Sequence, residues 1–255
     1  MIECGSLEYA HARLHARHGQ RLDDAAWRRI EVIREFAPLL EAMRASALRP
    51  WLSGITVDSS VHRVEASLRG QWRALIDERA AWMPSSWHGA LQWCAVLPDL
   101  AVLQHLARGG EPAAWMHDEP AWRELSAAQP PARAALLQSG PFAALAAAWA
   151  TPQSLGRAWR DEWQRRLPQP LGDDGGLLQQ LVRVLLQHRQ VFVAASPSEG
   201  WLLRGALRAR LTLLLRRAAL QPALVFIDLA LCALDLERLR AELLRRLLFP
   251  RWQVA

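Results

Sequence analysis

Apolar residues recur at helical spacing along most of the chain. From Ser60 onward, Val64, Leu68, Trp72 and Ile76 fall four positions apart, so they share one face of a helix. No stretch shows the sustained alternation typical of a strand, and the strand-favouring run at residues 191–193 is too short to outweigh its helical flanks. The pattern predicts an all-α protein.

Capping residues and prolines predict where these helices begin and end. Ser6 is placed to cap a helix over residues 6–18, and Gly19 is placed to end it. The pair Asp23-Asp24 predicts the start of a second helix, which Pro38 should kink or split. Seven prolines between residues 110 and 170 predict that this part of the chain forms short helices.

A glycine- and aspartate-rich segment at residues 172–176 is the best candidate for a linker. We therefore expect N-terminal helical modules over residues 1–170, a linker at residues 171–176 and a basic C-terminal helical module over residues 177–255. Within the last module, helices are expected at residues 177–195, 198–220 and 222–248, the third broken near Asp235.

Two parts of the sequence are similar to each other, with offsets of 136 to 139 residues. In each, a long helix ends at a proline turn, an apolar helix follows, and an Asp-Leu-x-x-Leu step starts a closing helix at Asp99 or Asp235. The repeat predicts that residues 60–108 and 199–248 superpose as helical hairpins. The expected fold is therefore a set of repeated helical-hairpin modules packed into one compact or funnel-like body.

The composition restricts the chemistry. The chain has no lysine, and all 31 of its basic residues are arginine, which excludes a phosphate-binding lysine, a Schiff base and a lysine general base. Residues 157–255 hold 16 arginines against nine acidic residues, a net charge of +7. Such a region can meet an acidic partner, nucleic acid or anionic lipid, but the spacing of arginines among leucines is also typical of a solvated helix face.

The cysteines and the hydropathy bear on the cellular location. Cys4, Cys94 and Cys232 are far apart and form no CxxC pair, which indicates a reducing compartment. The first residues do not form a signal peptide. The longest apolar stretch, residues 223–234, is only 12 residues long and contains Asp228, so it is too short to span a bilayer. We expect a soluble, cytoplasmic protein.

Three histidines on one helix raise the question of a metal site. His11, His15 and His18 lie at i, i+4 and i+7, but no glutamate stands between them in HExxH order. Arg13 and Arg17 on the same helix also disfavour a bound cation. A polar helix face is the preferred interpretation.

Other candidate motifs are incomplete. His117-Asp118 has the order of the central pair in HD-type phosphohydrolases, with His105 and Asp161 as candidate partners, but its position before Pro120 is typical of a turn and helix start. The Asp pairs at residues 23–24 and 173–174 do not complete an Asp-rich isoprenoid synthase motif. We therefore expect no catalytic residue, no cofactor and no metal.

The chain has 13 tryptophans, which would suit base stacking in a nucleic-acid-binding protein. Five of them instead occupy apolar-periodic positions, which predicts that they pack in the core. These are Trp27, Trp72, Trp82, Trp87 and Trp93.

Three segments together resemble the V-ATPase d-subunit family, whose prokaryotic members are the rotor-adaptor subunits of V/A-type rotary ATPases. Residues 9–17 are similar to the opening helix of that family, Tyr-x-Asn-Ala-Arg-Val/Ile-Arg-x-Arg, with His11 in place of the asparagine. Residues 90–108, with Asp99-Leu100-x-x-Leu103-Gln104, resemble its Asp-Leu-x-Asn-Leu helix. Residues 229–250 resemble its closing helix. The chain is shorter than typical members.

This resemblance implies a non-catalytic subunit that sits on the membrane ion-carrying ring and receives the foot of the rotor shaft. It also implies a location at the cytoplasmic face of the inner membrane, reached through partner subunits. The alternatives from the residues are an Arg-rich all-α nucleic-acid-binding or regulatory protein, and an all-α metal-dependent enzyme. For the coupling role, the terminal helices provide the expected partner interface: Tyr9, Arg13, Arg17, Arg238 and Arg245.

Overall fold

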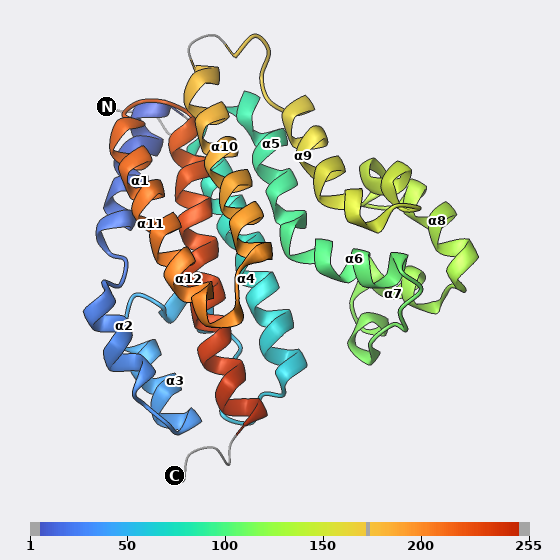
Figure 1. Cartoon of the computed structure of the whole chain (residues 1–255), viewed down its shortest axis with the longest axis horizontal. Coiled ribbons are helices and arrows are strands. Elements are labelled where there is room, and N and C mark those ends of the chain that lie inside the picture. Colours follow the sequence, from blue (N-terminus) through green and yellow to red (C-terminus); the bar gives the residue numbers. More distant parts are fainter. Residues whose placement is uncertain (1–5, 172–173, 250–255) are drawn as a thin grey trace. The chain divides into compact units, whose positions relative to one another are not determined.

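A computed structural model describes residues 6–171 and 174–249 of the chain (Figure 1). Within these residues the secondary structure is helical and contains no strand, which confirms the all-α prediction. The chain divides into two compact units. Unit 1 consists of Met1–Ser85 and Gln169–Ala255, and unit 2 consists of Ser86–Pro168.

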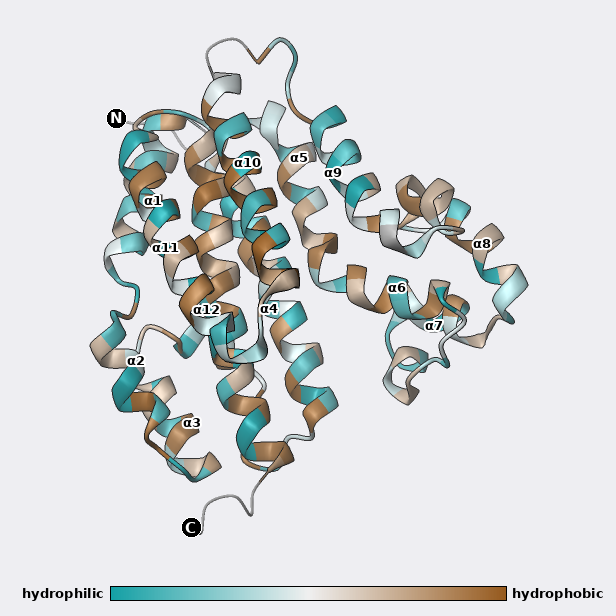
Figure 2. Cartoon of the chain, viewed as in Figure 1, coloured by the Kyte–Doolittle hydropathy of each residue, from teal (hydrophilic) through white to brown (hydrophobic). Residues whose placement is uncertain are grey.

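Unit 1 is built from both ends of the chain around the last helix, α12. This helix packs against α1, α3, α4, α10 and α11, and most of its first half is buried. Figure 2 shows that these helices carry both hydrophobic and hydrophilic residues. The α-helices of unit 1 are α1 (Leu7–Gly19), α2 (Asp24–Glu31), α3 (Phe36–Arg44), α4 (Val61–Trp82), α10 (Asp174–Ala194), α11 (Gly200–Arg217) and α12 (Ala223–Leu248).

The first helices of unit 1 start at the caps that the sequence predicts. The Ser6 hydroxyl accepts a hydrogen bond from the backbone of Tyr9 at 3.1 Å, and the Asp23 carboxylate accepts one from Ala26 at 2.7 Å. Each bond satisfies a backbone N–H that has no partner inside its helix. Pro38 does not kink a long helix. The chain instead leaves the helix at residues 32–35 and places Pro38 in the first turn of α3, where a proline removes no helical hydrogen bond.

One hydrophobic cluster joins the N-terminal helices to the end of α12. Trp27, Leu39 and Met43 are almost fully buried there and pack with Leu239 and Leu243. The five tryptophans expected in the core are all buried, with at most 6% of their surface exposed. That prediction is confirmed.

Unit 2 is a continuous stretch of short helices, as its prolines predict. Pro120 and Pro130 stand at the first positions of two of them. The indole N–H groups of Trp93 and Trp159 each donate to the backbone carbonyl of the other, at 2.9 and 3.2 Å. The α-helices are α5 (His88–Trp93), α6 (Leu100–Ala107), α7 (Pro120–Ala127), α8 (Pro130–Ser139) and α9 (Leu155–Arg165), with short 3₁₀ helices between them.

The repeated hairpins are not confirmed. A helix begins next to Asp99, as expected, but no helix begins at Asp235, because α12 continues unbroken through it. Residues 60–108 also belong to both units, whereas residues 199–248 lie in unit 1 alone.

The expected linker at residues 171–176 includes residues 172 and 173, which lie outside the described part. Helix α10 begins at Asp174, three residues earlier than expected, so Gly175 and Gly176 are helical. The two units therefore follow a different division from the expected modules.

Among the helices described, none is both long enough and apolar enough to cross a membrane.

Candidate functional site

Two carboxylates on α12 bind arginines from three other parts of unit 1. Asp228, which has no exposed surface, accepts hydrogen bonds from Arg21 Nη2 at 2.7 Å and Arg79 Nε at 2.9 Å. Two turns later, Asp235 accepts from Arg21 Nη1 and Arg208 Nη2, both at 2.5 Å. Because Arg21 follows α1, Arg79 lies on α4 and Arg208 on α11, this buried network ties all three to α12.

The network also contains a thiol. Cys232 Sγ accepts a hydrogen bond from Arg21 Nη2 at 2.9 Å. Burial, together with the negative charge of Asp228, raises the pKa of the Cys232 thiol to about 12. The thiol is therefore protonated near neutral pH and is a poor nucleophile. Burial alone would lower the pKa of Arg21, but Cys232, Asp228 and Asp235 outweigh it and raise that pKa.

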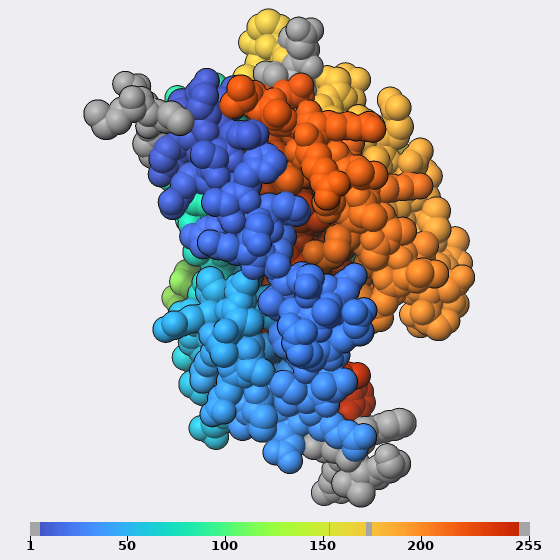
Figure 3. All heavy atoms as spheres, turned by 90° about the vertical axis from the view of Figure 1, so that its left-hand side faces the viewer, coloured from blue at the N-terminus to red at the C-terminus, as the bar shows by residue number. Residues whose placement is uncertain are grey.

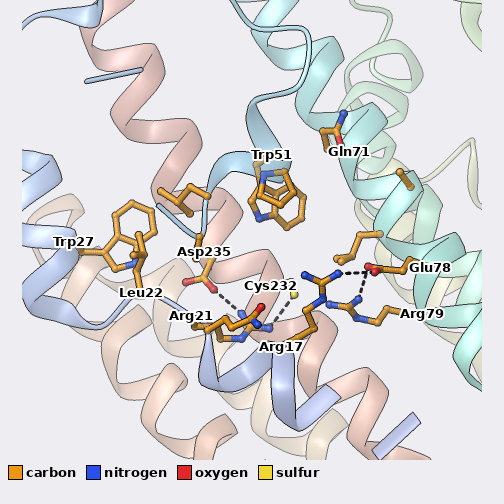
Figure 4. A pocket seen from close by; sticks show the side chains of 16 residues that line it. Arg17, Arg21, Leu22, Trp27, Trp51, Gln71, Glu78, Arg79, Cys232 and Asp235 are labelled. Atoms are coloured by element: carbon orange, nitrogen blue, oxygen red, sulfur yellow. Dashed lines mark hydrogen bonds and ion pairs between the residues drawn. The ribbon is translucent and has the colours of Figure 1, made fainter. Parts of the chain in front are cut away.

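A pocket of about 470 Å³ lies over this network (Figure 4). Glu78 stands at its side, where it pairs with Arg17 at 3.0 Å and with Arg79 at 2.6 Å. Each carboxylate that lines the pocket is thus bound by an arginine. This arrangement favours a role for these carboxylates in holding helices together over a role in proton transfer. The apolar lining comes from Leu22, Trp27, Ala47, Leu48, Pro50, Trp51, Ala74 and Leu75.

Three of the five predicted interface residues lie together at the junction of α1 and α4. The Arg13 guanidinium lies 5.0 Å from the ring centroid of Trp82 and 5.9 Å from that of Tyr9, within the range of a cation–π interaction. Arg17 reaches Glu78 of α4. These side chains therefore hold the two helices together while leaving much of Arg13 and Arg17 at the surface.

The other two predicted residues lie at a different junction, between α12 and α2. Arg238 Nε pairs with Glu31 at 2.7 Å, and its guanidinium stacks 4.7 Å from the Trp27 ring centroid. Arg245 pairs with Glu242 at 3.0 Å. The five predicted residues thus form two groups rather than one surface.

A groove of about 1290 Å³ runs between α2 and α11, with α12 at its floor. Figure 3 shows this side of the molecule, with α2 in blue and α11 in orange. The groove includes Arg238 and Arg245. Large apolar side chains on its walls are exposed: Val32 by 74%, Trp201 by 48%, Leu202 by 75% and Leu213 by 54%.

The histidines of α1 form a polar face. The rings of His11 and His15 lie 4.4 Å apart. Burial lowers the pKa of His15 and of His18, and the charges of His11 and Arg21, respectively, lower them further. Within residues 6–171 and 174–249, no three His, Cys, Asp or Glu side chains are grouped so that they would hold a metal ion.

The pair His117-Asp118 lies in unit 2. His117 Nδ1 shares a hydrogen bond of 3.0 Å with the Ser126 hydroxyl, and Asp118 ends a short 3₁₀ helix. The partner of this histidine therefore lies within the same unit.

The residues of the buried network were not predicted as a site. The sequence holds one signal for them, because Asp228 is the only charged residue in the apolar run 223–234. A charge in such a run indicates a buried ion pair, but it does not name the partners, which lie 207 and 149 residues away. In comparisons with known proteins, the chain matches no family model, no curated protein and no solved structure.

Proposed function

We propose that this protein is a non-catalytic adaptor that couples other protein subunits. The supporting observation is the buried network of Arg21, Arg79, Arg208, Asp228 and Asp235, which locks helices from both ends of the chain to α12. Buried ion pairs with several hydrogen bonds fix one arrangement, because any other leaves a charge without a partner in the interior. A body that transmits force between partners needs such fixed packing.

More specifically, we propose the central-stalk socket subunit of a V/A-type ion-translocating ATPase, placed between the rotor shaft and the membrane ring. This rests on the sequence resemblance of residues 9–17, 90–108 and 229–250. The first and third of these segments fall on α1 and α12, which pack against each other in unit 1; residue 250 lies outside the described part. In this role the protein needs no cofactor or metal, and it is peripheral to the cytoplasmic face of the membrane.

Charge reversal tests the coupling role. The variant Arg13→Glu, Arg17→Glu, Arg245→Glu should stay folded, because all three arginines are exposed, and exposed ion pairs and cation–π contacts contribute only about 0–1 kcal/mol each. It should retain less of the ring and shaft subunits of the host's rotary ATPase in co-purification. A control variant with the same charge change, Arg183→Glu, Arg189→Glu, Arg210→Glu, alters exposed arginines elsewhere and should retain them fully. If the unaltered protein retains no ATPase subunit, the rotor proposal falls.

Nucleic-acid binding is the second candidate function, and the groove between α2 and α11 is the observation that favours it. Six arginines line this groove against three acidic residues. Binding to phosphates releases counterions, so the logarithm of the affinity would fall steeply with the logarithm of the salt concentration. Fluorescence anisotropy with labelled single- and double-stranded oligonucleotides between about 50 and 200 mM salt measures that slope.

A further inference from the structure

Helix α11 carries apolar residues on more than one side. Its inner side is buried in unit 1 and consists of leucines. Its outer side carries Leu202 and Leu213, which remain more than half exposed. Large apolar side chains that are exposed together on a surface mark a site that a partner can cover. The buried leucines are Leu207, Leu211, Leu214 and Leu215.

The outer side of α11 has a shape that allows another helix to approach it closely. Gly205, Ala206 and Ala209 line the groove between Leu202 and Leu213, so small side chains lie between two large apolar ones. Val32, the residue that follows α2, lies on the opposite wall. Leu202 and Leu213 are 11 positions apart, which corresponds to roughly 16 Å along a helix, or three turns.

The charges of the groove are unbalanced. Its acidic residues already have partners, because Asp24 and Glu31 pair with Arg238, and Glu242 pairs with Arg245. Arg28 and Arg216 also line the groove and are exposed, and among the described residues neither pairs with an acidic side chain. The groove therefore offers positive charge at exposed positions beside an apolar strip.

We propose that the groove between α2 and α11 binds an acidic amphipathic helix of a partner protein, of about three to four turns. Its apolar face would cover Leu202, Leu213 and Val32, and its acidic flanks would meet Arg28 and Arg216. Helices dock into apolar grooves through residues at i, i+3, i+4 and i+7. The exposed leucines favour a protein helix over nucleic acid, whose backbone would leave them uncovered. The proposal deepens the adaptor function and rests on it.

Synthetic peptides test this without any rotary ATPase subunit. The probe is a fluorescein-labelled helical peptide of about 16 residues, with leucines at i, i+3, i+4 and i+7 spacing and glutamates on both flanks. One comparison peptide replaces every glutamate by lysine, and another has the same composition in scrambled order. We expect the glutamate peptide to bind the full chain at least about tenfold more tightly than either, which is about 1.4 kcal/mol.

Exposed substitutions locate the peptide. Leu213→Asp, and separately the double change Arg28→Glu, Arg216→Glu, should each weaken binding of the glutamate peptide about tenfold or more. The double change should also improve binding of the lysine peptide. The matched controls are Val193→Asp, at an exposed position of α10, and Arg210→Glu, on α11 but outside the groove lining. Both controls should bind like the unaltered protein, and melting curves followed by circular dichroism should show all variants folded.

Other outcomes overturn the proposal. No measurable binding of the glutamate peptide at about 100 μM, or equal binding of the scrambled peptide, rejects a helix site of this chemistry. Oligonucleotide binding that is lost on Arg28→Glu, Arg216→Glu but kept on Leu213→Asp would assign the groove to nucleic acid. Self-association that Leu213→Asp abolishes would assign it to a second copy of this chain. Peptide binding without retention of ATPase subunits would support the helix-binding groove and reject the rotor proposal. Retention of ATPase subunits without peptide binding would support the rotor proposal and reject the helix-binding groove.

Discussion

Replacing Asp228 by asparagine removes the charge at the centre of the buried network while keeping the shape of the side chain. The carboxylate accepts charge-assisted hydrogen bonds from Arg21 and Arg79, and each such bond contributes about 1.5–3 kcal/mol. Arg21 keeps Asp235 and Arg79 keeps Glu78, which offsets part of the loss. We therefore expect the free energy of unfolding to fall by about 3 kcal/mol, at the lower end for a broken buried pair.

Urea unfolding followed by circular dichroism measures this change, and calorimetry should show a melting temperature lower by roughly 6–12 °C. Asp58→Asn, at an exposed position, is the matched control and should change stability by less than about 0.5 kcal/mol. The double variant Asp228→Asn, Arg79→Met should lose less free energy of unfolding than the two single variants lose together, by at least about 1 kcal/mol. A loss below about 1 kcal/mol for Asp228→Asn, with strict additivity in the double variant, would refute the reasoning.

Three further substitutions probe other parts of unit 1. Asp23→Ala removes the cap of α2 and should lower the free energy of unfolding by about 1 kcal/mol in urea titrations, with Asp23→Asn nearly neutral. Trp27→Ala empties a fully buried position and should lower it by about 3–5 kcal/mol. The folded state lowers the pKa of His18 from 6.5, so below pH 6.5 the unfolded chain binds a proton more readily than the folded chain. We therefore expect the contribution of His18 to the free energy of unfolding to be fully present above pH 6.5 and to be lost as the pH falls below it. His18→Gln should make this fall shallower, and an unchanged slope would show that His18 does not contribute.

The starts of the N-terminal helices were predictable because capping is local. Ser6, Asp23 and Ser60 each bind a backbone N–H three residues further on, so the cap and its partner lie within one stretch of sequence. The core tryptophans were predictable for a similar reason, since helical spacing alone places them on inner faces. Local pattern was therefore enough to predict the fold class and the starts of these helices.

The environment of Asp235 in the structure shows what the local sequence pattern could not reveal. Its sequence surroundings match those of Asp99, and an aspartate at such a step suits a helix start. In the structure, Arg21 and Arg208 bind its carboxylate inside α12. With its charge satisfied from 214 and 27 residues away, the helix has no reason to break there. The buried site was missed because its members lie far apart in the sequence.

The division of unit 1 between both chain ends has a consequence for synthesis on the ribosome. Trp27, Leu39 and Met43 find part of their packing only on Leu239 and Leu243, which emerge from the ribosome much later. Residues 86–168 form a continuous unit whose partners are all present as soon as it is made. We therefore expect the middle of the nascent chain to become protease-resistant before its beginning does. The first 85 residues would then stay incompletely packed until α12 is synthesised. During this period they expose the most apolar surface for chaperones to bind.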